Sequence, residues 1–135
     1  MTEFGYPDLK IELDDNGGTL RDISSYVTSI NGWTKEQIIE ELTAAGDDTD
    51  RWAAIGFEMK QPVTLTGPYE DASNGLVDLT KGAGGATRTL QLTFDGATAA
   101  DVETVECIIQ TISRNPSRGA LTAYEVTLRP TGAIT

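Results

Sequence analysis

The sequence has no histidine and only one cysteine, Cys107, among its 135 residues. One cysteine cannot form a disulfide within the chain, and the absence of imidazole groups removes His-containing zinc sites, His-based catalytic triads and most general-base schemes. Cys107 lies in an apolar run, so a buried, unreactive thiol is favoured over a nucleophile. We therefore expect a protein that is not an enzyme and needs no cofactor.

Long apolar runs and clusters of basic residues are also missing. No stretch approaches the roughly 20 apolar residues of a membrane span, and the first ten residues lack the basic start and the apolar centre of a signal peptide. We expect no membrane anchor and no secretion signal. Ten Lys and Arg residues stand against 21 Asp and Glu residues, a formal net charge of −11. No basic stripe is present to neutralise phosphates, so tight binding of nucleic acid is not expected.

What is present is the composition of an ordinary globular protein. Apolar residues make up 39% of the chain and charged residues 23%, a balance that lacks the apolar depletion of disordered segments. The length favours a single domain over residues 1–135, because a chain of this size can bury enough surface to form one core.

The acidic residues are concentrated near the start, where the first fifty residues contain twelve acids and three bases. Two clusters, residues 14–16 and 47–50, offer oxygen ligands of the kind that calcium binds. An EF-hand loop beginning at Asp14 would place Thr19 where a glycine is needed and Ser25 where a bidentate glutamate is needed. We therefore interpret both clusters as solvated turns and predict no metal site.

Apolar residues at alternate positions are the main structural signal. Leu9, Ile11 and Leu13 alternate with charged residues and predict a half-buried strand, with residues 19–30 returning as the second strand of a hairpin. Residues 102–112 are apolar on both faces, which favours a central strand covered on two sides. The same alternation predicts further strands at residues 63–69, 88–94 and 121–128.

Three other segments do not follow this alternation. Residues 34–42 have a capping-box pattern and helix-favouring residues but no apolar stripe at helical spacing, so helix and strand both stay open. Residues 76–80 are expected to form a short helix. Residues 44–57 combine an acidic, turn-rich stretch with aromatic side chains and predict a long excursion. Trp52 and Phe57 in this excursion either anchor a partner or pack in the chain's own core.

Three groups of residues follow one another along the chain: Asp22, Ile23, Ser24, Tyr26 and Val27, then Glu41, Leu42, Thr43, Gly46 and Asp47, and finally Gly67, Tyr69 and Asp71. The first is an Asp-Ile-Ser-x-Tyr-Val strand end, the second leads into an excursion loop, and the third is a Gly-x-Tyr-x-Asp turn after an alternating strand. In this order they resemble signatures of the major tail tube proteins of long-tailed, siphovirus-like bacteriophages.

The resemblance implies a mainly β fold, an antiparallel β-sandwich or half-barrel with one short flanking helix and a long excursion loop, and it favours a strand for residues 34–42. It also implies a structural virion protein, made in the cytoplasm of the bacterial host and located in the phage tail. Its copies would form hexameric rings that stack into a tube, a conduit for genome delivery through which DNA passes without being bound. Other tail proteins would join the ends of the tube.

Two alternatives belong beside this expectation. A tail terminator or a minor tail protein of the same ancestry would share these signatures. A free-standing β-sandwich binding module would share the strand pattern alone. If the purified protein forms rings or tubes, the structural role is favoured; if it does not, the binding module is favoured.

The resemblance and the charge distribution together give two sets of candidate functional residues. The expected subunit interface lies in the excursion and comprises Gly46, Asp47, Asp48, Arg51, Trp52 and Phe57. A channel that lets DNA slide past is expected to be acidic, because attraction to phosphates would trap the cargo. The candidate channel-lining acids are Glu12, Asp14, Asp22, Glu40 and Glu41, with a solvated outer face as the alternative for each.

Overall fold

The computed structural model describes residues 3–15, 17–46, 49–81, 87–96 and 100–131. Its strands are β1 (Lys10–Asp14), β2 (Leu20–Asp22), β3 (Ser29–Asn31), β4 (Glu36–Glu41), β5 (Trp52–Glu58), β6 (Val63–Pro68), β7 (Thr87–Thr93), β8 (Val102–Asn115) and β9 (Ala123–Pro130). One α-helix, α1 (Leu76–Thr80), and two short 3₁₀ turns, η1 (Tyr6–Asp8) and η2 (Ser24–Tyr26), complete the described elements.

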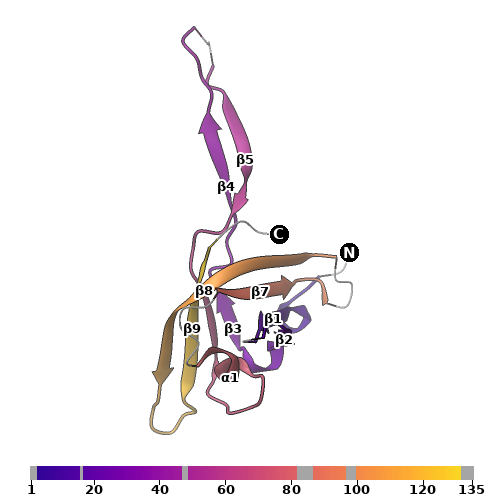
Figure 1. Ribbon diagram of the computed structural model, residues 1–135, viewed down its shortest axis with the longest axis vertical. Helices are drawn as coiled ribbons and strands as arrows, with labels where there is room; N and C mark the ends of the chain where they lie inside the picture. Colours follow the sequence, from indigo (N-terminus) through magenta and orange to yellow (C-terminus); the bar gives the residue numbers. More distant parts are fainter. Residues whose placement is uncertain (1–2, 16, 47–48, 82–86, 97–99, 132–135) are drawn as a thin grey trace.

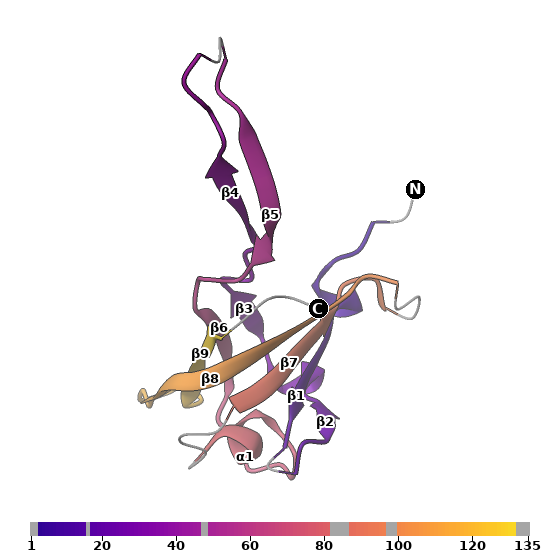
Figure 2. The ribbon, with the colours of Figure 1, turned by 45° about the horizontal axis from the view of Figure 1, so that its top comes forward.

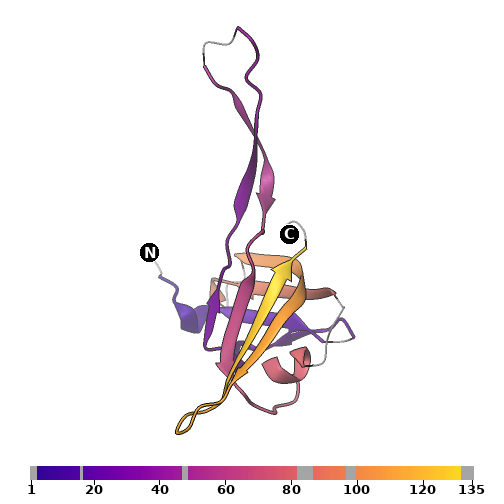
Figure 3. The same cartoon turned by 90° about the vertical axis from the view of Figure 1, so that its left-hand side faces the viewer.

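Seven strands form one antiparallel sheet, the body of the molecule, in the order β2-β1-β7-β8-β9-β6-β3 (Figure 1). The sheet bends sharply, so that β1 and β7 run across the direction of β6 and β9 (Figure 3). Helix α1 lies at the lower end of the body in these views. The result is the mainly β half-barrel with one short helix that the sequence predicts.

The core fills the concave side of this sheet. Leu13, Leu90 and Val105 are direct neighbours across β1, β7 and β8, and each is at most 1% exposed. The inward side chains of β9 are also buried, as their alternation predicts. Helix α1 adds its apolar side chains, and its Thr80 hydroxyl lies 2.7 Å from the Tyr124 hydroxyl. Short as it is, the helix is therefore tied to the sheet by packing and by a buried hydrogen bond.

The remaining two strands form a separate hairpin, which we call the arm and define as residues 36–58. Strands β4 and β5 pair with each other and with no strand of the body sheet. Figures 1 and 2 show the arm projecting from the body along the longest axis of the molecule. Residues 36–41 are thus a strand, as the tail tube resemblance implies and against their local helical preference.

Three expectations from the sequence need correction. The excursion is not a loop throughout, because β5 occupies residues 52–58 and pairs with β4. Residues 19–30 are not one returning strand: β2 has three residues, η2 follows, and β3 pairs with β6 instead of β1. Strand β8 is central but covered on one side only, since Val102 and Ile108 are 37% and 42% exposed. Strand pairing decides the first two and the packing of other elements against the sheet decides the third, and local sequence patterns contain neither.

Gly67 permits a close contact between β6 and the chain segment before β3. Thr28 donates its backbone N–H to the Thr66 carbonyl at 2.7 Å. A Cβ atom at position 67 would lie 2.0 Å from the Tyr26 carbonyl oxygen. Such a contact is far inside van der Waals distance, so a side chain there must force the two segments apart.

We predict that Gly67→Ala lowers the free energy of unfolding by about 1 to 3 kcal/mol through this overpacking. Gly5→Ala is the control, because a Cβ at position 5 meets nothing nearer than 3.6 Å. Urea unfolding followed by circular dichroism measures both variants. Equal stability of Gly67→Ala and the unmodified protein would contradict the close contact.

Candidate assembly interface

A β-bulge in the arm determines which of its side chains share a face. Gln37 pairs with Phe57, and Glu41 pairs with Trp52, with a register shift between Ile38 and Ile39. Trp52 and Phe57 are five positions apart, which in a regular strand would place them on opposite faces. The extra residue of the bulge cancels that offset. Both aromatic rings therefore lie on the same face of the arm.

We call this face the aromatic face of the arm and define it by Gln37, Ile39, Glu41, Trp52 and Phe57. Its three large apolar side chains are 57%, 60% and 51% exposed for Ile39, Trp52 and Phe57 respectively. At the base of the arm the Lys35 ammonium lies 5.5 Å from the centre of the Phe57 ring. Such exposure in one small hairpin is characteristic of a surface that another molecule covers.

The other face of the arm carries Ile38, with Glu36, Glu40 and Glu58 around it, and Ile55 is the extra residue of the bulge between the two registers. Ile55 is 60% exposed. Glu36 and Glu58 are direct cross-strand partners, and like charges in that arrangement repel each other. The two faces of the arm are therefore chemically different: one is aromatic, the other aliphatic and acidic.

The predicted interface residues that the structure describes all lie on the arm. Gly46 and Arg51 are exposed towards its end, where the Arg51 backbone N–H donates to the Thr43 hydroxyl at 2.8 Å. Trp52 and Phe57 are on the aromatic face, whereas Asp47 and Asp48 lie outside the described residues. Ile39 is missing from the predicted set because that set was drawn from the excursion of residues 44–57, and Ile39 lies before it.

Trp33, by contrast, packs against the body. Its ring meets Phe94 edge-on at 6.3 Å between ring centres, and its indole N–H points to Glu103 at 3.4 Å. Glu103 also lies 3.3 Å from the Lys35 ammonium. These contacts attach the base of the arm to β8, so the projecting hairpin has an anchored start.

Three of the five candidate acids share the convex face of the body sheet, which we call the polar sheet face. Asp22, Glu12, Gln91 and Thr104 lie directly opposite one another across β2, β1, β7 and β8. Gln91 donates to Glu12 at 3.3 Å and accepts from Thr104 at 3.2 Å. Asp14 follows Glu12 by two positions and so belongs to the same face.

Glu106 is an acid of this face that sequence reasoning missed. Thr89 donates its hydroxyl to the exposed Glu106 carboxylate at 2.7 Å, and the two residues are cross-strand partners. Strict alternation from the buried Val105 would have indicated its outward direction. Glu40 and Glu41 lie apart from the sheet, on the arm.

Asp14 is different from its neighbours because it is only 8% exposed. The buried Arg88 guanidinium donates to the Asp14 backbone carbonyl at 2.7 Å and lies 4.0 Å from its carboxylate. Burial raises the pKa of Asp14, the charges of Glu106 and Asp15 add to that increase, and the Thr89 backbone N–H and Arg88 oppose it. Asp14 thus has a role inside the fold.

Cys107 is buried, as the sequence predicts. It is 1% exposed, and its thiol donates to the Arg88 carbonyl at 3.4 Å. Burial, reinforced by the nearby charges of Glu106 and Asp14, raises the pKa of the thiol to about 12. The thiolate that nucleophilic chemistry requires is therefore strongly disfavoured in the folded protein.

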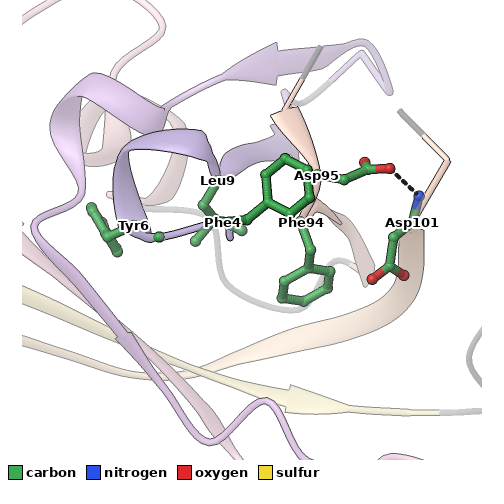
Figure 4. A pocket seen from close by; sticks show the side chains of 7 residues that line it. Phe4, Tyr6, Leu9, Phe94, Asp95 and Asp101 are labelled. Atoms are coloured by element: carbon green, nitrogen blue, oxygen red, sulfur yellow. Dashed lines mark hydrogen bonds between the residues drawn. The ribbon is translucent and has the colours of Figure 1, made fainter. Parts of the chain in front are cut away.

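A surface pocket of about 580 Å³ lies between the start of the chain and the end of β7 (Figure 4). Phe4, Tyr6, Leu9 and Phe94 supply apolar walls, with Asp95 and Asp101 at the side. Asp95 accepts hydrogen bonds from the Ala100 and Asp101 backbone N–H groups, so its carboxylate ties the end of β7 to the start of β8. The described residues contain no group of three Cys, Asp or Glu side chains placed to hold a metal ion.

No protein-family model matches the chain, and no curated protein sequence matches it significantly. Solved structures match over almost its full length. A chain in the tail of an empty gene transfer agent particle, refined with C6 symmetry, has a TM-score of 0.66 at 15% identity and covers 96% of this chain and 95% of that one. A chain in the virion of the native gene transfer agent particle has a TM-score of 0.62 at 15% identity, with the same coverage.

The third similar structure is the cap that terminates the tube of the anti-feeding prophage. It has a TM-score of 0.63 at 12% identity and covers 100% of this chain and 91% of that chain. Identities this low establish the fold alone. The chain therefore has the fold of phage-tail-like tube proteins, as its sequence signatures predict. None of the helices in the described ranges is long and apolar enough to span a membrane.

The raised pKa of Asp14 leads to a prediction about pH. A carboxyl whose pKa is higher in the folded state favours folding while it is protonated, and that contribution is lost as pH rises through the folded pKa. Asp14→Asn removes the titration. The stability of the wild type minus that of the variant should therefore fall as pH rises from below the ordinary pKa of an aspartate to above the raised pKa of Asp14. Urea unfolding over this range measures it; a difference that rises with pH would contradict the assignment.

Proposed function

We propose that this chain is a structural subunit of a phage-tail-like tube, in which copies form six-membered rings that stack around a channel for genome delivery. The observation that carries the proposal is the near full-length match to a chain of a C6-symmetric tail and to a tube cap. On this proposal the protein is located in the virion, contacts other tail proteins at the ends of the tube and has no catalytic role. Electron microscopy of the purified protein tests it directly: tubes support the proposal, and a permanent monomer contradicts it.

The edges of the body sheet support ring formation. Its outer strands, β2 and β3, have three residues each and leave backbone groups unpaired on their free sides. Contact between the β2 edge of one copy and the β3 edge of the next is heterologous, because two different surfaces meet. Such a contact closes into a ring when the rotation between copies divides the circle evenly.

The arm supports contacts beyond the body. An isolated two-stranded hairpin is marginally stable in water, and this one exposes five large apolar side chains, Ile39, Leu42, Trp52, Ile55 and Phe57. If neighbouring copies cover the arm, its strands are stabilised and its apolar side chains are removed from water. The interface proposed here consists of these residues together with Gly46 and Arg51.

The polar sheet face supports the channel. Glu12, Asp22 and Glu106 give it an excess of negative charge, offset in part by Lys10 at 3.6 Å from Glu12. Phosphates passing within the screening distance of about 8 Å would be repelled. We place these three acids on the channel wall and leave Asp14 out, because it is buried.

A terminating subunit is the second candidate function. The full coverage of this chain by the match to a tube-terminating cap favours it specifically. A terminator and a tube subunit differ in one observable property: the terminator forms a ring that does not stack on itself. Micrographs of the purified protein that show single rings and no tubes would favour this alternative.

We predict that Trp52→Ser combined with Phe57→Ser abolishes tube formation and leaves a folded protein, because both rings are exposed in the single chain and their loss removes contact area without disturbing the core. Analytical ultracentrifugation reports the assembled fraction, and circular dichroism reports folding. Val102→Ser, which removes an exposed apolar side chain from the body, is the matched control. Unchanged assembly of the double variant would show that the arm is not an interface.

We predict that Asp22→Lys combined with Glu106→Lys yields tubes that retain duplex DNA, because inward-facing cations attract phosphates. Retention should weaken as salt is raised. The control is Glu70→Lys with Asp71→Lys, which makes the same charge change at exposed positions outside the polar sheet face. Equal DNA retention by the two double variants would show that Asp22 and Glu106 do not line the channel.

A further inference from the structure

The two ends of the longest axis of the molecule carry opposite charge. The arm, residues 36–58, contains seven acidic residues and one basic residue. The turn between β8 and β9, which we call the tip and define as residues 114–122, contains two arginines and no acid. Figures 1 and 3 show the arm and the tip at opposite ends of the molecule.

The tip presents an apolar side chain beside a cation. Leu121 is 83% exposed, the most exposed of the large apolar residues described. Arg118 is exposed three positions earlier, in a turn held by the Ala120 backbone N–H to Ser117 carbonyl bond at 3.2 Å. Arg114 lies over the rings of Tyr69 and Tyr124, at 5.8 and 5.7 Å from their centres. Both arginines are exposed, but the tyrosine rings hold Arg114 against the body, so Arg118 is the cation nearer to Leu121 in the turn.

The aromatic face of the arm presents the complementary arrangement. Glu41 is exposed and lies directly opposite Trp52, with Ile39 two positions along on the same face. An acid next to apolar side chains on the arm thus matches a cation next to an apolar side chain on the tip. Glu40 is the adjacent acid in sequence, but strand alternation places it on the other face.

We propose that the aromatic face of the arm of one copy docks onto the tip of a second copy in the next ring, with Glu41 facing Arg118 and with Trp52 and Ile39 covering Leu121. This inference rests on the proposed function, because it names the contact that stacks the rings. The two surfaces differ and lie at opposite ends of the chain, so the contact repeats without closing on itself. An open stack is the result.

The apolar pocket near the start of the chain is a less suitable receptor for the arm. Its polar members are Asp95 and Asp101, whose charge has the same sign as that of the arm. Like charges brought together in an interface suppress binding. Charge complementarity therefore selects the tip.

Exchange of the two charges tests the contact. Arg118→Glu should place two acids face to face, and Glu41→Arg should place two cations face to face, so each single variant should keep rings and lose tubes. The double variant restores opposite charges and should restore tubes. Glu40→Arg is the control, since it makes the same change on the other face of the arm and should leave tubes intact. Tube length in electron micrographs and sedimentation measure the outcome.

Mixing the two single variants gives an independent measurement. Rings of Arg118→Glu and rings of Glu41→Arg should not stack on themselves, yet alternate rings of the two kinds have opposite charges at every junction. Tubes should therefore form only in the mixture. Leu121→Ser should shorten wild-type tubes without changing net charge, through loss of the apolar part of the contact.

Several results would overturn the inference. Tubes of normal length from Arg118→Glu, failure of both the double variant and the mixture to form tubes, or loss of tubes with Glu40→Arg would each do so. Rings of the wild type that never stack would overturn it and leave ring formation intact. A wild type that stays monomeric would overturn the proposed function as well. Circular dichroism of each variant verifies folding, which exposed positions 40, 41, 118 and 121 should not disturb.

Discussion

The structure depends on one constraint: a single continuous sheet has only one face that can be buried by its own chain. Bending lets the concave face enclose a core in which Leu13, Leu90 and Tyr124 are fully buried. The convex face then has to be largely polar, and from β2 to β8 it carries threonines, Gln91 and acids in register, with Val102 and Ile108 as exposed apolar residues. A protein with one buried layer has a large outer surface relative to its core, which suits a component of an assembly.

The arm cannot satisfy that constraint by itself. It has two strands and no third element against which to bury a face, so its apolar side chains stay exposed in the single chain. The bulge next to Ile38 concentrates the exposed apolar area, because it places Trp52 and Phe57 on the same face of the arm. A regular hairpin would divide them between two weaker surfaces. The local irregularity therefore creates a strongly apolar surface on the arm.

The sequence predicts the parts of the fold whose signal is local. Leu90 and Leu92 alternate with polar residues, and β7 is found where they predict it. The short helix over residues 76–80 and the inward residues of β9 follow in the same way. For residues 36–41 the local signal favours helix, and their pairing with β5 overrides it, since tertiary context outweighs propensity.

Features that depend on distant partners could not be predicted. The burial of Asp14 follows from its contact with Arg88, 74 positions later in the chain. The shared face of Trp52 and Phe57 follows from a bulge that only the β4 register reveals. The position of Glu106 beside the predicted acids requires the pairing of β7 with β8. In each case the residue type was visible in the sequence and its neighbours were not.

The acidic surplus, finally, is not one property with one role. Asp14 is held inside the fold beside Arg88. Asp22 and Glu106 lie on the polar sheet face, where on our proposal their negative charge repels DNA. Glu41 lies beside Trp52 on the arm, where on our proposal it meets the basic tip of the next copy. Because a charge acts over about a Debye length, acids at these different places affect different partners. The net charge of −11 is therefore divided among separate groups of acids, and each group acts only on the molecules near it.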